Sequence, residues 1–70
     1  MDFGRRLRTM RAVRDLTQIE LADAAMTTQF FISAIEGGKM LPSPSLKDRL
    51  RKALDWTALE DEAFALLSRE

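Results

Sequence analysis

The chain contains no cysteine and no histidine among its 70 residues. The absence of cysteine excludes disulfides and thiolate metal sites, and the absence of histidine removes the usual general base and the commonest transition-metal ligand. The sequence pairs no nucleophile with a base, and the carboxylates at 60–62 are better explained as charges at the start of a helix. We therefore expect neither an enzyme nor a metal or cofactor site.

Long apolar runs are absent as well. No stretch approaches the roughly 20 residues that a membrane span needs, so we expect no membrane partner. Residues 1–15 carry too many charges for a signal peptide, which favours a cytoplasmic protein. The length predicts one domain over residues 1–70, and so short a chain buries only about 60% of its unfolded surface. Dimerisation would stabilise such a domain considerably.

The formal net charge is zero, yet the charges are divided unevenly along the chain. Residues 1–52 contain 10 Lys/Arg and 6 Asp/Glu, a net +4, whereas residues 53–70 contain one Arg and 5 Asp/Glu, a net −4. A basic front and an acidic tail suit a protein that turns one side towards phosphates. Solvated helix faces would have the same composition.

The spacing of apolar residues is helical throughout, and no stretch shows the sustained alternation of a strand. Thr17 and Glu20 form a capping box, Gly37-Gly38 is a strong C-terminal signal, and Ser43 precedes a proline at the first helical position. The pattern predicts a compact five-helix, all-α domain. Its helices are expected at residues 2–14, 18–25, 28–36, 44–54 and 58–68.

Residues 17–39 are the most informative segment, because they predict two short helices joined by a tight turn. The inner face carries a small shared core made of Leu21, Ala22, Ile32 and Ile35. The outer side of the second helix carries Thr28, Gln29 and Ser33. Such a pair can place its second helix in the major groove of DNA, which is just wide enough for an α-helix. An ordinary helical hairpin without a ligand is the alternative.

Short motifs occur along nearly the whole chain, and the spacings between them define one common register. They are Phe3-Gly4, Leu7-Arg8, Leu16-Thr17-Gln18, Leu21-Ala22, Ile32-Ser33, Ile35-Glu36, Gly38, Pro42-Ser43 and Ala53-Leu54. In this register the chain resembles the Cro/cI-type helix-turn-helix family, also called XRE, of phage repressors and bacterial regulators. The resemblance implies a lambda-repressor-like fold, a bacterial or phage origin, and double-stranded DNA as the partner.

The residues expected to contact DNA bases are Thr28, Gln29, Phe30 and Ser33. Gln29 can pair bidentately with N6 and N7 of adenine. Phe30 is unusual, because the family often has a polar residue at this position. Its ring can press on thymine methyl groups, tuck sideways into the core, or mark a protein-binding surface. Phe31 is expected to pack, given its spacing to Ile35.

The residues expected to contact DNA phosphates are Thr17, Gln18, Lys39 and Arg8. In the family, the glutamine at Gln18 clamps a backbone phosphate and touches the first recognition residue. Thr17 stands at a helix N-terminus, where free N–H groups bind anions. Arg11 and Glu36 match the family's partly buried ion pair between helices one and three, so we expect a structural role for both.

The turn of the motif departs from the family at Met26, where glycine is usual. That position often requires positive φ, which costs a residue other than glycine roughly 1 kcal/mol or more. Either the turn differs slightly in this chain, or the strain is accepted in return for burying Met26.

The end of the chain offers more apolar surface than a core of this size buries easily. The residues expected at a dimer interface are Trp56, Leu59, Phe64 and Leu67. Two protomers that meet there with two-fold symmetry would place their recognition helices about one DNA turn apart. Alternatively Trp56 closes the core, and it is large enough to do both.

These features together predict a sequence-specific DNA-binding transcriptional regulator. We expect a repressor that binds a palindromic operator as a homodimer. The alternative is a protein-interaction adaptor or an antitoxin built on the same fold, with a protein partner that docks on Phe30.

Overall fold

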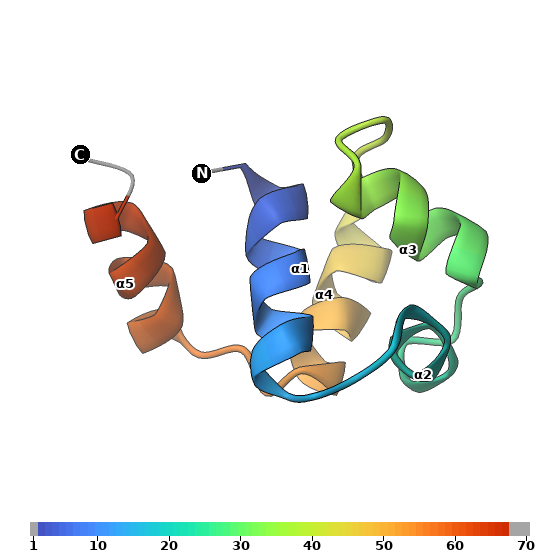
Figure 1. Cartoon of the computed structure of the whole chain (residues 1–70), viewed down its shortest axis with the longest axis horizontal. Coiled ribbons are helices and arrows are strands. Elements are labelled where there is room, and N and C mark those ends of the chain that lie inside the picture. The colour runs from blue at the N-terminus through green and yellow to red at the C-terminus, as the bar shows by residue number, and fades with distance from the viewer. Residues whose placement is uncertain (1, 68–70) are drawn as a thin grey trace.

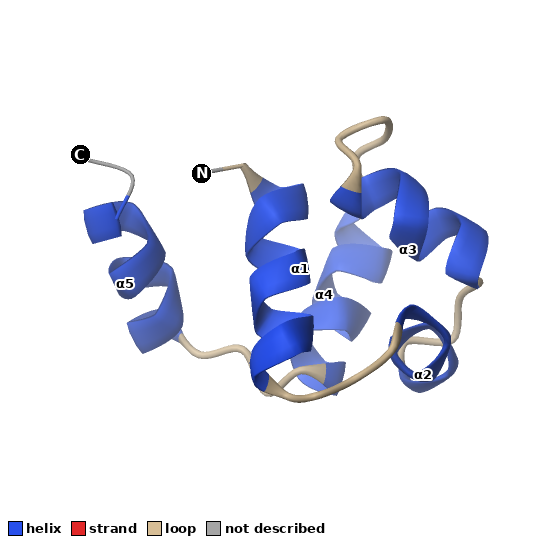
Figure 2. Cartoon of the chain, viewed as in Figure 1, coloured by secondary structure: helices blue, strands red, loops and turns tan. Residues whose placement is uncertain are grey.

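The computed structural model describes residues 2–67, which form five helices and no strand (Figures 1 and 2). The helices are α1 (Phe3–Val13), α2 (Gln18–Ala24), α3 (Gln29–Glu36), α4 (Pro44–Ala53) and α5 (Ala58–Leu67). The predicted all-α fold class is confirmed, and each described boundary lies within one residue of the predicted position. The predicted end of the last helix, at residue 68, lies outside the described residues.

Helices α1 to α4 each begin at a side chain that accepts a hydrogen bond from the backbone N–H three residues further on. The accepting residues are Asp2, Thr17, Thr28 and Ser43, at distances of 2.9 to 3.3 Å. At α2 the Glu20 carboxylate also accepts from the Thr17 N–H at 2.9 Å, which completes the capping box. These bonds satisfy N–H groups that have no partner within the helix.

The same four helices end in one common backbone motif. The residue after each C-cap has a φ between 50° and 74°, and these residues are Asp15, Met26, Gly38 and Asp55. The next N–H then bonds to the carbonyl five residues back, as the Leu16 N–H does to the Arg11 oxygen at 3.0 Å. This Schellman arrangement satisfies carbonyls that the helix end leaves free.

Met26 adopts its left-handed conformation, with φ 57°, while 75% of the residue stays exposed. Of the two alternatives considered for this turn, the one in which burial of Met26 offsets the strain is therefore excluded. Hydrogen bonds hold the turn instead, among them the one from the Met26 N–H to the Asp23 carbonyl at 3.3 Å. Helix α4 adds a further contact, because Arg49 Nε donates to the Ala25 carbonyl at 2.9 Å.

Helices α1 to α4 enclose a core of aliphatic side chains. Its largest fully buried members are Leu7, Met10, Leu21, Ile32, Ile35, Leu50 and Leu54. Helix α1 approaches the end of α3 so closely that a Cβ atom added at Gly4 would lie 2.2 Å from the Ile35 carbonyl oxygen. Only glycine fits at this crossing, which brings the C-terminal end of α3 against α1.

Trp56 closes the core between α1 and α5. Its ring stacks on Phe3 at 5.4 Å between centroids, and Phe64 of α5 meets it edge-on at 5.9 Å. Its indole Nε1 donates to a carboxylate oxygen of Asp61 at 2.9 Å. Of the two roles considered for Trp56, the structure therefore describes the closing of the core.

Helix α5 lies beside α1, on the side away from α2 and α3 (Figure 1). Its carboxylates bind arginines of the other helices. Asp61 pairs with Arg51 and lies 4.0 Å from Arg6, and Glu60 lies 3.3 Å from Arg14. The hydrogen bond from Arg51 holds the pKa of Asp61 below its ordinary value of 3.8.

Acid should therefore weaken the attachment of α5. Because the folded-state pKa of Asp61 is lowered, its ionised carboxylate stabilises the fold at pH values above 3.8, and this stabilisation is lost as the pH falls through the lowered pKa. We expect the free energy of unfolding, measured with urea, to change less between about pH 7 and about pH 3 in Asp61→Asn than in the unsubstituted chain. Asp48→Asn is the control, since it removes an aspartate whose ion pair, with the exposed Lys52, lies within α4 and does not attach α5.

Replacing Met26 with glycine should stabilise the fold by about 0.5–1 kcal/mol, because glycine adopts positive φ without a steric cost. Little packing is lost, since the methionine side chain is exposed. Thr27→Gly is the matched control, because Thr27 does not have positive φ and glycine there should destabilise. Urea unfolding measures both changes, and an equal loss in the two variants would contradict strain at Met26.

Candidate nucleic-acid interface

A buried carboxylate lies behind the outer surface of the helix-turn-helix. Glu36, the last residue of α3, accepts two hydrogen bonds from Arg11 of α1, from Nε at 2.7 Å and from Nη2 at 3.0 Å. Arg11 Nη1 also donates to the Leu16 carbonyl at 2.9 Å. The hydrogen bond to Glu36 raises the pKa of Arg11, so the guanidinium stays charged. The pair joins α1, the loop before α2, and the end of α3.

A chain of polar side chains leads from Glu36 to the start of α3. Gln18 Nε2 donates to Glu36 Oε1 at 3.2 Å, and Gln29 Nε2 donates to Gln18 Oε1 at 3.5 Å. An ionised carboxylate only accepts hydrogen bonds, so the amide nitrogen of Gln18 must face Glu36 and its oxygen must face Gln29. The buried charge thus orients the first residue of α3 through one intermediate side chain.

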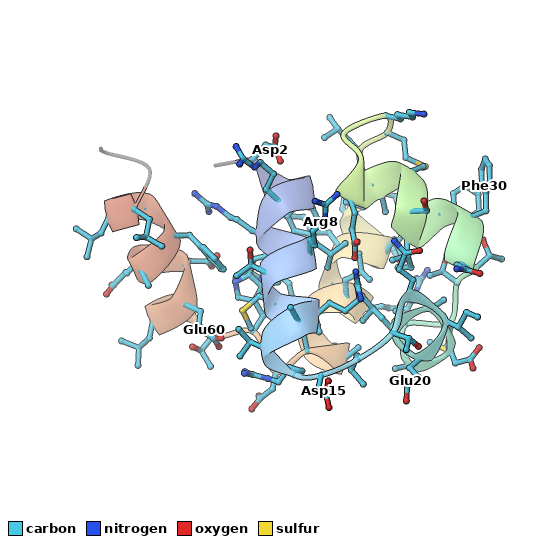
Figure 3. The ribbon with its side chains drawn as sticks, in the orientation of Figure 1. Asp2, Arg8, Asp15, Glu20, Phe30 and Glu60 are labelled. Atoms are coloured by element: carbon cyan, nitrogen blue, oxygen red, sulfur yellow. The ribbon has the colours of Figure 1, made fainter. Side chains whose placement is uncertain are left out.

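Arg8 stands at the edge of this network. Its Nε lies 3.9 Å from Glu36 Oε1, while 65% of its side chain is exposed. In Figure 3 it lies between α1 and α3. Arg8 is therefore held close to the carboxylate and still reaches solvent, as a phosphate contact requires.

The surface above the network is a hollow of about 520 Å³. Its lining comes from α1, α2, α3 and the following turn, and includes Arg8, Gln18, Phe30, Ser33, Glu36 and Lys39. Expected base contacts and expected phosphate contacts, which are separated by up to 31 positions in the sequence, thus share one surface. Gln29 joins this surface through its hydrogen bond to Gln18.

Thr17 and Thr28 lie at the two helix starts of the motif. Both are exposed, and the hydroxyl oxygen of each accepts a backbone N–H as the N-cap. The capping role leaves each hydroxyl hydrogen free to be donated to a phosphate or a base edge, because a hydroxyl both donates and accepts.

Phe30 and Phe31 face different surroundings. Phe30 is 75% exposed and Phe31 is 39% exposed, and their rings meet edge-on at 5.6 Å between centroids. Phe30 does not tuck into the core, which excludes one of the three roles considered for it. Phe31 packs only in part, beside a second hollow of about 650 Å³ that is also lined by Met26, Leu41 and Leu46.

The residues expected at a dimer interface divide into two groups. Trp56 and Phe64 are 7% and 5% exposed, so they are core residues of a single chain and offer no free apolar surface. Leu59 and Leu67 remain largely exposed on α5, together with Leu66, which the sequence reasoning did not single out. The interface stays a prediction and now rests on these leucines.

Sequence reasoning also missed two arginines that bind the ends of distant helices. Arg49 of α4 donates to the Ala25 carbonyl, and Arg14 donates through Nε to the Leu54 carbonyl at 2.9 Å. Both partners are backbone oxygens at helix ends far away in the sequence. No local pattern marks such contacts, so only the assembled fold identifies them.

The chain belongs to the helix-turn-helix domain family, whose model matches residues 2–65. This family is typical of XRE-like DNA-binding proteins, which agrees with the resemblance noted from the sequence motifs. The domain suggests a DNA-binding regulator, and the family is typically non-enzymatic. No curated protein and no solved structure gives a significant match. Within residues 2–67, no helix has the length and apolar character needed to cross a membrane.

Removing the charge of Glu36 should destabilise the fold strongly. In Glu36→Gln, Arg11 keeps its charge without a carboxylate partner, and we expect a loss of about 2–3 kcal/mol in the free energy of unfolding. Urea unfolding measures the loss. The control is Glu62→Gln, which changes an exposed glutamate of α5 and should stay within about 0.5 kcal/mol. Equal stability of the two variants would contradict a structural role for the pair.

Proposed function

We propose that the chain is a sequence-specific transcriptional regulator, a repressor that binds a palindromic operator in double-stranded DNA as a homodimer. The observation that carries this proposal is the polar chain from buried Glu36 through Gln18 to Gln29. It fixes the side chain that opens α3 beside a surface that carries the cationic groups of Arg8 and Lys39. A helical hairpin without a ligand has no need for such an arrangement.

In the proposed complex α3 lies in the major groove. Gln29 presents its amide to an adenine edge, where one side chain can make two hydrogen bonds. Thr28, Phe30 and Ser33 are exposed beside it and contact neighbouring base pairs. Phosphate contacts come from Arg8, Gln18, Thr17 and Lys39, which flank α3 and fix its position on the duplex.

The proposed dimer forms through α5. The exposed leucines of this helix, Leu59, Leu66 and Leu67, form the apolar surface that a second copy would cover. Two-fold symmetry then sets two copies of α3 about one DNA turn apart, which matches a palindromic site. We place this regulator in the cytoplasm of a bacterial or phage-infected cell, where its concentration sets the dimer population and the occupancy of the operator.

A protein-interaction adaptor or an antitoxin is the second candidate. The observation that favours it is the exposed Phe30, together with the apolar hollow beside Phe31. If Phe30→Ala lost a protein partner while its affinity for DNA stayed unchanged, the adaptor would be the better proposal.

Selection from a randomised DNA pool tests the leading proposal. We expect an enriched site with two-fold symmetry and half-sites about one turn apart. Binding to the selected duplex should weaken steeply with salt, with a log–log slope of about −0.9 per neutralised phosphate. A flat salt response would contradict the proposal.

Single variants then separate base contacts from phosphate contacts. Gln29→Ala should lose about 1–3 kcal/mol of discrimination at one base pair of each half-site, with most non-specific binding intact. Lys39→Ala should weaken all sequences alike and reduce the salt slope by about 1 per half-site. Lys52→Ala is the matched control, because Lys52 is exposed on α4 and is not part of the hollow.

A further inference from the structure

Phe30 is an aromatic side chain held in place on the recognition surface. It is the second residue of α3, directly after Gln29. Its ring is exposed, and the Phe31 ring supports it through an edge-on contact with an interplanar angle of 74°. In Figure 3 it projects outward from the N-terminal end of α3. A large apolar group is thus presented where the proposed complex places base edges.

The surroundings of Phe30 combine apolar with cationic and amide groups. The hollow that Phe30 lines is shared with the apolar side chains of Ala34 and Met40 and with Arg8, Gln18 and Lys39. A second hollow lies beside Phe31 and Met26, and Phe30 does not line it. A partner that covers Phe30 must therefore combine an apolar group with acceptors for cationic and amide side chains.

The major groove of DNA offers such a combination. It presents phosphates and polar base edges, and its apolar group is the C5-methyl group of thymine. 5-Methylcytosine carries the same methyl group at the same ring position. An unmethylated cytosine or a uracil carries only a hydrogen at C5, so the phenyl ring loses the apolar contact that the methyl group would make.

We propose that Phe30 recognises the C5-methyl group of a pyrimidine in the half-site, adjacent to the base pair that Gln29 contacts. This inference rests on the proposed function, because it assumes that α3 lies in the major groove. Gln29 and Phe30 are the first two residues of α3, so both lie at the end of the helix that the proposed complex places against base edges. The site thus reads an adenine through two hydrogen bonds and a neighbouring methyl group through apolar contact.

The test uses the duplex selected from the randomised pool and the full chain. Each thymine is replaced in turn by uracil, which removes one methyl group and leaves the hydrogen-bonding edge intact. Each cytosine is replaced in turn by 5-methylcytosine. Fluorescence anisotropy measures the Kd for each duplex with the unsubstituted chain and with Phe30→Ala.

At one position of each half-site, we expect uracil to weaken binding about fourfold, which corresponds to loss of one buried methyl group. If the recognised base is instead 5-methylcytosine, methylation of one cytosine should strengthen binding by a similar factor. Either effect should disappear in Phe30→Ala, because the variant has no ring to contact the methyl group. The inference is overturned if no position responds, or if the response persists in Phe30→Ala.

Two controls keep the result specific. Leu41→Ala removes another exposed apolar side chain, which lines the hollow beside Phe31, and should retain the methyl dependence. Phe30→Leu keeps an apolar group at the position and should retain part of the methyl dependence. Salt-dependent binding without any methyl dependence would overturn this inference alone. Absence of salt-dependent binding would overturn the proposed function itself.

Discussion

A carboxylate stays ionised inside a protein only where hydrogen-bond donors surround it. At Glu36 these donors come from Arg11 and Gln18, so three helices must meet in one arrangement for the charge to be satisfied. Buried ion pairs add little net stability compared with apolar packing, but the loss of one partner is costly. The position of α3 relative to α1 and α2 depends on this requirement. The missing side chain at Gly4 allows the close crossing that brings the partners within reach.

The two sides of α3 divide the exposed surface between two hollows. The side with Phe30 and Ser33 opens on the hollow that Arg8 and Lys39 also line, and the side with Phe31 opens on the hollow beside the turn at Met26. The two adjacent aromatic residues therefore have different neighbours although they share one helix. Because the Schellman turn at Met26 fixes where α3 begins, the division depends on a backbone conformation as much as on side-chain identity.

Local signals made most of the fold predictable. Thr17 with Glu20, and Ser43 before a proline, cap helices through contacts within one turn, so the sequence alone was enough to place those helix starts. The Arg11–Glu36 contact was expected only from the family resemblance. The burial of Trp56 in the core was not predictable, because it depends on Phe3 and Phe64 from two other helices. The exposure of Met26 was left open by the sequence for the same reason: burial is a property of the assembled helices, whereas strain at positive φ is local.

Helix α5 is attached in a different way from the other four. Glu60 and Asp61 attach it to the rest of the domain through ion pairs, and Phe64 attaches it through packing on Trp56. The leucines near its end stay exposed. Segments with few buried apolar contacts open at a lower free energy than the global unfolding of the domain. The amide hydrogens of α5 should therefore exchange with solvent while those of α1 to α4 remain protected. Any partner that covers the exposed leucines would slow that exchange, so the order of α5 and its association are thermodynamically linked.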